Sequence, residues 1–115
     1  MLLSLDHVIV RSAAPEETLA ELTARARTPV LAEVTRVHGM ASGIVRAGGI
    51  DIEVLRVGEA PAAPHGYGVG FVADVALDEA VARLRALGFA TSTAPRVTVG
   101  DGENRRTWRA AQLRG

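Results

Sequence analysis

The segment Gly48-Gly49-Ile50-Asp51-Ile52-Glu53-Val54-Leu55 decides how this chain folds. Two adjacent glycines are typical of a tight turn between antiparallel strands. The residues that follow alternate in character, so the isoleucines and Val54 face one side of a strand while Asp51 and Glu53 face the other. The segment therefore predicts a half-buried strand over 50–57, paired through a hairpin with a strand over 41–47.

The residues before this hairpin predict a strand, a helix and a further strand. The short apolar, β-branched run 5–10 is typical of a buried strand. Pro15, followed by two acidic residues, predicts the start of a helix over 15–27, with Leu19, Leu22 and Ala26 forming one apolar stripe. Residues 30–37 predict a strand, which a turn at His38-Gly39 joins to the hairpin. The order of elements is thus β-α-β-β-β.

The second half of the chain repeats this order approximately. Residues 58–66, rich in proline and alanine, indicate a linker. A strand over 68–74 and a helix over 77–87 follow; Asp74 or Asp78 would cap this helix and Gly88 would end it. We further expect a strand within 91–99 interrupted by Pro95, a loop over 100–104 and a last strand over 106–113. The chain is predicted to be one domain, 1–115, with modules at about 1–57 and 67–115 that pack together because neither can bury its sheet alone.

Composition excludes several classes of function. Thirteen positive residues, all arginine, balance thirteen negative ones, so a broad electrostatic surface for nucleic acid or membrane is not expected. Cysteine is absent, which excludes disulfides, thiolate zinc sites and a cysteine nucleophile. The sequence shows neither a membrane-spanning apolar run nor a signal peptide, so we expect a soluble cytoplasmic protein that binds a small molecule.

Five segments of the sequence resemble a known protein family. They are the segments 5–10, 48–55, 68–74, 78–88 and 102–109. In this order they resemble the vicinal oxygen chelate superfamily, which includes glyoxalase I, extradiol dioxygenases and bleomycin-resistance proteins. The resemblance implies an α+β fold in which two βαβββ modules form a curved mixed sheet around a cleft. It also implies a divalent metal (Zn, Ni, Mn or Fe) held by side chains of the first and last strand of each module.

The resemblance places metal ligands at His7 and Glu53, and Glu53 is also the candidate catalytic residue, while the carboxylate that would shuttle the proton is not identified. In the second module the family's histidine falls at Gly68, and the last strand with its glutamate is expected to be absent. His65 would compensate if its strand began early, and His38 would lie in a turn near the mouth of the cleft. The metal site is therefore predicted to be incomplete, because two ligands rarely hold a metal tightly.

Each candidate residue also has a plainer interpretation. His7 could be a hydrogen-bonded structural histidine, and Glu53 could pair with Arg46 or Arg109. Gly68 and Gly70 could leave room for a ligand or mark close strand packing. The ligand-binding candidates Trp108 and Arg109 could instead be a core residue and a solvated edge; Arg109 with Arg105 and Arg106 could also bind an anionic substrate group.

Two main functions follow from these expectations. The first is a metal-dependent lyase, isomerase or dioxygenase that acts on a small organic substrate. The alternative is a metal-free protein that binds or sequesters a small molecule, as the bleomycin-resistance proteins do. A third reading is an interaction domain that has lost its site. The missing final strand would leave a sheet edge uncovered, so we also predict a homodimer.

Overall fold

The computed structural model describes residues 1–37, 39–93, 96–99 and 106–114. It divides into two compact units, which are described separately. The sheet unit is Leu5–Phe71, and the helix-α2 unit is Met1–Ser4 together with Val72–Gly115. Along the chain the elements are β1 (Leu3–Arg11), α1 (Pro15–Ala26), β2 (Val30–Val37), β3 (Met40–Ala47), β4 (Ile50–Arg56), β5 (His65–Ala73), α2 (Leu77–Ala86), β6 (Ala90–Thr91), β7 (Arg96–Val99), β8 (Arg106–Arg109) and β9 (Leu113–Arg114).

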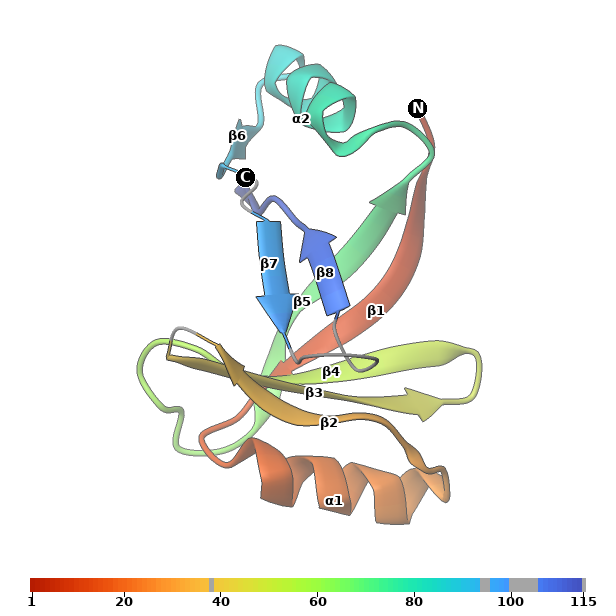
Figure 1. Ribbon diagram of the computed structural model, residues 1–115, viewed down its shortest axis with the longest axis vertical. Helices are drawn as coiled ribbons and strands as arrows, with labels where there is room; N and C mark the ends of the chain where they lie inside the picture. The colour runs from red at the N-terminus through yellow and green to blue at the C-terminus, as the bar shows by residue number, and fades with distance from the viewer. Residues whose placement is uncertain (38, 94–95, 100–105, 115) are drawn as a thin grey trace. The chain divides into compact units, whose positions relative to one another are not determined.

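One five-stranded mixed sheet organises the fold, in the order β2-β3-β4-β1-β5. The strands β2, β3 and β4 pair antiparallel, whereas β1 and β4 pair in parallel. A parallel pair needs a crossover between its strands, and α1 supplies part of it. The fold class is α+β, as predicted, and the first module has the expected β-α-β-β-β order (Figure 1).

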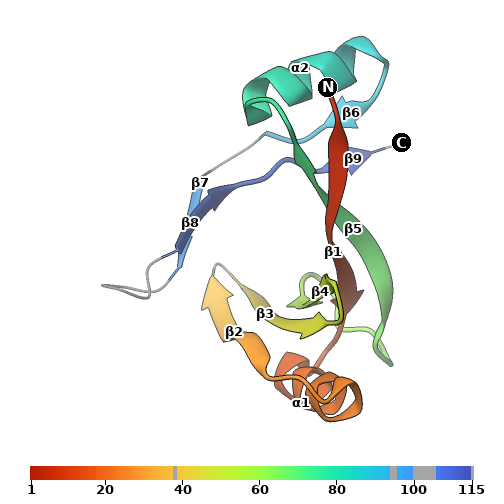
Figure 2. The same cartoon turned by 90° about the vertical axis from the view of Figure 1, so that its right-hand side faces the viewer.

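Helix α1 covers one face of the sheet unit and forms its core. Pro15 occupies the first turn, where its missing N–H has no partner to lose, and the helix ends at Arg27 in a left-handed conformation (φ 52°). Leu19 packs against Val45 and Val54, which are fully buried. Burial of such side chains contributes about 1.5–3 kcal/mol each. Both views show α1 lying along strands β2 and β3 (Figures 1 and 2).

The hairpin at Gly48-Gly49 is confirmed. Ala47 pairs with Ile50 across the two-residue turn, and Gly48 has a φ of 68°, which glycine adopts without steric cost. In this register, successive side chains of β4 point to opposite faces of the sheet, as the alternating sequence predicts. Val54 faces α1 and the core, whereas Glu53 lies on the opposite face.

The helix-α2 unit contains α2 and two small antiparallel sheets, one of β6 with β9 and one of β7 with β8. Gly88, with a φ of 96°, follows the end of α2 as predicted. The predicted side-chain cap is wrong, because the N-cap residue is Ala76 and no side chain caps the helix. Asp74 instead accepts a hydrogen bond from the Leu2 N–H at 2.8 Å.

Several strand boundaries differ from the prediction, and β1 runs over Leu3–Arg11 rather than 5–10. Strand β5 begins at His65 rather than at 68, so the last two residues of the predicted linker 58–66 are strand; glycine and histidine carry no strand signal of their own. The strand expected within 91–99 is interrupted, as predicted, and forms β6 and β7, while Pro95 itself lies outside the described residues. The strand expected over 106–113 is split into β8 and β9. Between β8 and β9, the Gln112 N–H donates a hydrogen bond to the Ser92 hydroxyl at 2.8 Å.

Strand β5 lies at the edge of the five-stranded sheet, next to β1. Within the described residues no strand pairs with its other side. No helix in the described part of the chain has both the length and the apolar character needed to cross a bilayer.

Candidate functional site

His7 and Glu53 meet on the face of the sheet opposite α1. The parallel register of β1 and β4 aligns Ile9 with Glu53 and His7 with Asp51, so these side chains share one face. His7 Nε2 lies 3.5 Å from Glu53 Oε1. Their side chains are 27% and 22% exposed, which leaves both partly accessible to a ligand. The two residues that the sequence analysis singled out are therefore neighbours, while their metal-binding and catalytic roles remain predictions.

Two further side chains fix the outer atoms of this pair. Asp6 Oδ2 lies 2.8 Å from His7 Nδ1, and the Ser42 hydroxyl donates a hydrogen bond to Glu53 Oε2 at 2.6 Å. Each partner leaves the inner atom, Nε2 or Oε1, facing the other residue. The sequence analysis missed both. Ser42 could have been found from the hairpin register, because it lies two residues from Ile44, which pairs with Glu53.

Gly70 provides the space that the His7 ring occupies. A Cβ at this position would lie 2.1 Å from His7 Cε1, far inside van der Waals contact. At Gly68, by contrast, a Cβ would meet nothing within 4 Å. Gly70 is thus a point of close approach between β5 and a side chain of β1, and a ligand-binding role for Gly68 remains a prediction.

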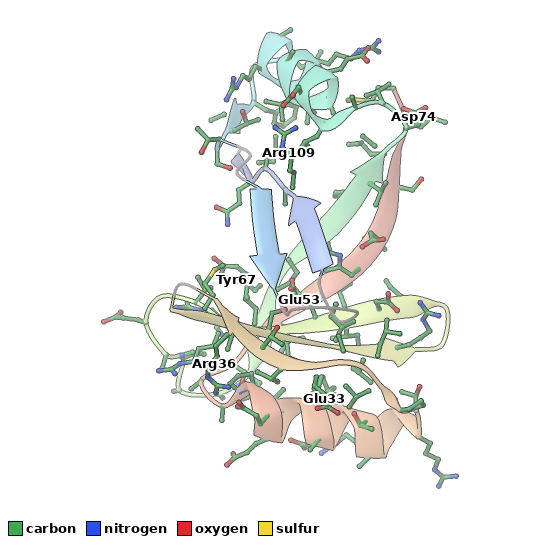
Figure 3. The ribbon with its side chains drawn as sticks, in the orientation of Figure 1. Glu33, Arg36, Glu53, Tyr67, Asp74 and Arg109 are labelled. Atoms are coloured by element: carbon green, nitrogen blue, oxygen red, sulfur yellow. The ribbon has the colours of Figure 1, made fainter. Side chains whose placement is uncertain are left out.

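Arg46 and Arg109, the arginines proposed as partners of Glu53, form ion pairs with aspartates instead. Arg46 Nε donates to Asp51 Oδ1 at 2.9 Å, and this hydrogen bond raises the pKa of Arg46. Arg109 lies at the end of β8 (Figure 3), and its Nη2 donates to Asp78 Oδ1 at 2.8 Å. The side chain of Trp108 lies outside what the structure describes, so its predicted ligand contact stays a prediction.

The atoms of His7 and Glu53 are of types that bind divalent ions, but two ligands are fewer than a metal site usually has. Imidazole nitrogen and carboxylate oxygen are ordinary ligands of zinc and related ions, and catalytic zinc sites take three protein ligands. Among the described residues no group of three His, Cys, Asp or Glu could hold a metal. His65, at the first position of β5, alternates away from Gly70, and its Nδ1 lies 3.3 Å from the Ala63 carbonyl oxygen. His38 lies outside the described residues.

The geometry of the pair determines what it can do. A carboxylate only accepts hydrogen bonds, so a neutral His7 donates a hydrogen bond from its Nδ1–H to Asp6 and presents a lone pair at Nε2. That lone pair then faces the carboxylate oxygen of Glu53 across 3.5 Å. Two lone pairs repel, and a proton or a cation placed between them satisfies both. The site is therefore suited to exchanging a proton or to holding a cation.

Comparisons with known proteins show the fold. No family model and no curated protein matches the sequence. Among solved structures, the chain is similar to the crystal structure of methylmalonyl-CoA epimerase from Mycobacterium tuberculosis, with a TM-score of 0.65 and 18% sequence identity. The match covers 92% of this chain and 77% of the epimerase. The chain thus shares its α+β fold with this epimerase.

Proposed function

We propose that this protein is an isomerase or lyase that moves a proton on a small organic substrate at His7 and Glu53. The observation that carries the proposal is the 3.5 Å approach of His7 Nε2 to Glu53 Oε1, with the outer atom of each held by Asp6 or Ser42. Groups that are positioned in this way can transfer protons without first reorganising.

The proposed chemistry is removal of a proton from a carbon next to a carbonyl. Glu53 Oε1 takes the proton, and the electron pair of the C–H bond moves onto the carbonyl oxygen. His7 acts in this step as an imidazolium, which donates from Nδ1–H to Asp6 and from Nε2–H to that oxygen. Return of a proton from Glu53 to the face that it left restores the substrate, and delivery of a proton from water to the opposite face gives the epimer. Departure of a β-substituent with its bonding electron pair gives a lyase product instead. Asp6 acts by orienting the ring of His7 and does not itself contact the substrate.

Methylmalonyl-CoA is the first substrate to test, because the structurally similar enzyme is named for it. The protein is incubated in D2O with this thioester and with simpler α-substituted acids, and loss of the α-proton signal is followed by NMR. Glu53→Gln and His7→Asn should each slow exchange by about 10²-fold or more, which is typical for loss of a general acid or base. Glu33→Gln removes an exposed carboxylate of β2 and should leave the rate unchanged. A wild-type protein that exchanges none of these substrates would contradict the proposal.

The metal is tested in parallel. We propose Zn, Ni, Mn or Fe only as ions that His7 and Glu53 would help to hold, with further ligands from outside the described residues or from substrate. Elemental analysis of purified wild type, His7→Ala and Glu53→Ala decides the matter. Stoichiometric metal that is lost in both variants would make the two residues ligands. A dioxygenase would need a redox metal and oxygen, and it rests on the family resemblance alone.

A second candidate function is metal-free binding of a small organic molecule. Metal-free binding is favoured by the small number of metal ligands, since among the described residues only two candidate ligands, His7 and Glu53, lie together. Saturable binding of a compound by metal-free protein, weakened by Glu53→Gln and without any proton exchange, would support this candidate over the enzyme.

A further inference from the structure

A pocket of about 330 Å³ lies in the helix-α2 unit. Its lining comes from α2, from the two residues after Thr91 and from the end of β8: Asp78, Val81, Ala82, Arg85, Ser92, Thr93 and Arg109. Its volume is at the lower end of the range of small-molecule sites, about 300–1,000 Å³. None of these residues belongs to the sheet unit, so the pocket is independent of the function proposed for His7 and Glu53.

The charges around this pocket do not cancel. Asp78 neutralises Arg109, whose two terminal nitrogens lie 2.8 and 3.3 Å from the carboxylate oxygens. This hydrogen bonding lowers the pKa of Asp78 and raises the pKa of Arg109, so both remain charged at neutral pH. Arg85 adds a second guanidinium to the lining. Among the described residues that line the pocket, two arginines and one aspartate give a formal net charge of +1.

Arg85 is held in place and still has donors to offer. Its Nε donates to the Thr91 hydroxyl at 2.6 Å, which fixes the plane of the guanidinium. No acidic residue of the described part of the chain forms an ion pair with it. A fixed guanidinium presents its N–H groups as a fork that matches the oxygens of a carboxylate or phosphate.

We propose that this pocket binds the oxyanion group, phosphate or carboxylate, of a small organic ligand through Arg85. Ser92 and Thr93 add hydroxyl groups to the same lining, and Val81 and Ala82 give an apolar wall for the carbon skeleton next to the anion. A few convergent polar groups on a partly apolar wall are the usual composition of a ligand site.

The test measures anion binding at constant ionic strength. Sodium phosphate and sodium acetate are titrated separately into the full chain, with sodium chloride adjusted to compensate, and the NMR signals of the arginine Nε–H groups are followed. The Arg85 signal should shift and saturate with phosphate or acetate, and the anion with the lower Kd identifies the group that the ligand carries.

Three variants locate the site. Arg85→Gln should weaken binding about tenfold, as expected for loss of a charged hydrogen-bond donor. Arg83→Gln is the matched control on the same helix: it removes the same charge, but Arg83 pairs with Glu79 and does not line this pocket. It should leave the Kd unchanged. Asp78→Asn should tighten binding, because it removes the competing carboxylate. A shift that does not saturate, or equal weakening in Arg83→Gln and Arg85→Gln, would overturn the proposal.

Discussion

At the scale of single residues, the candidate site depends on the fit of one imidazole ring over one glycine. The family resemblance pointed to His7 and Glu53, the alternation along their strands agreed with it, and the structure brings the two side chains together. It did not identify Asp6 or Ser42, because a hydrogen bond between side chains depends on rotamers and on strand register. Strand alternation fixes the face on which a residue lies, and tertiary packing fixes its partners.

Gly70→Ala should disrupt the site while leaving the fold intact. The added methyl group would overlap the His7 ring, and the ring must swing away from Glu53 because the backbone of β5 is fixed by its pairing with β1. We expect exchange activity or ligand binding to fall at least tenfold, and the NMR signals of the His7 ring to shift. Gly68→Ala, whose Cβ meets nothing within 4 Å, is the matched control and should change neither. Equal effects of the two substitutions would contradict this account.

At the scale of elements, α1 and the hairpin were predictable because local signals and packing agree. Helix α1 is favoured both by Pro15 in its first turn and by the apolar stripe through Leu19. The hairpin turn is favoured by the two glycines at 48 and 49. Strands after residue 88 were predicted less well, because short strands gain little from propensity and depend on pairing with distant segments. Gln112, between β8 and β9, is hydrogen-bonded in this way to the distant Ser92.

Gly43→Ala should destabilise the contact between α1 and β3. A Cβ at this position would lie 2.9 Å from Val34 Cγ2 and 3.0 Å from Leu19 Cδ2, in the packed core of the sheet unit. Overpacking of this kind costs about 1–3 kcal/mol in the free energy of unfolding. Urea denaturation followed by circular dichroism measures it. Gly49→Ala, which meets nothing within 4 Å, should change the unfolding free energy much less.

The ion pair between Asp78 of α2 and Arg109 of β8 should make the free energy of unfolding depend on pH. The hydrogen bond from Arg109 lowers the folded-state pKa of Asp78 below its ordinary value of 3.8. The pair therefore contributes fully above about pH 4, and its contribution is lost as the pH falls through the lowered folded value. Between about pH 5 and about pH 2, the free energy of unfolding of Asp78→Asn should fall less than that of the wild type. Arg109→Gln should behave in the same way, and combining the two should add little.

At the scale of the whole molecule, an unpaired sheet edge bears on assembly. Strand β5 has no strand on its outer side within the described residues, and its Val69 is 51% exposed. Proteins normally cover or blunt such an edge. The homodimer expected from the sequence remains a prediction, and this edge is where we place the contact.

Val69→Lys should therefore shift the protein toward monomer. A lysine on an edge strand disfavours pairing with another chain, because its charge would have to be desolvated. Sedimentation velocity at several protein concentrations measures the dimer fraction. Leu31→Lys places the same charge on β2, the opposite edge of the sheet, and should leave the dimer fraction unchanged. A wild type that is monomeric at all concentrations would refute the prediction.

The close approach at Gly70 also has a consequence for related sequences. Any residue with a β-carbon at position 70 would displace an imidazole at position 7, so the two positions cannot vary independently. In an alignment of related chains, glycine at 70 and histidine at 7 should be gained and lost together. That covariation would mark which relatives retain the same acid–base pair, even where overall similarity is too low to show it.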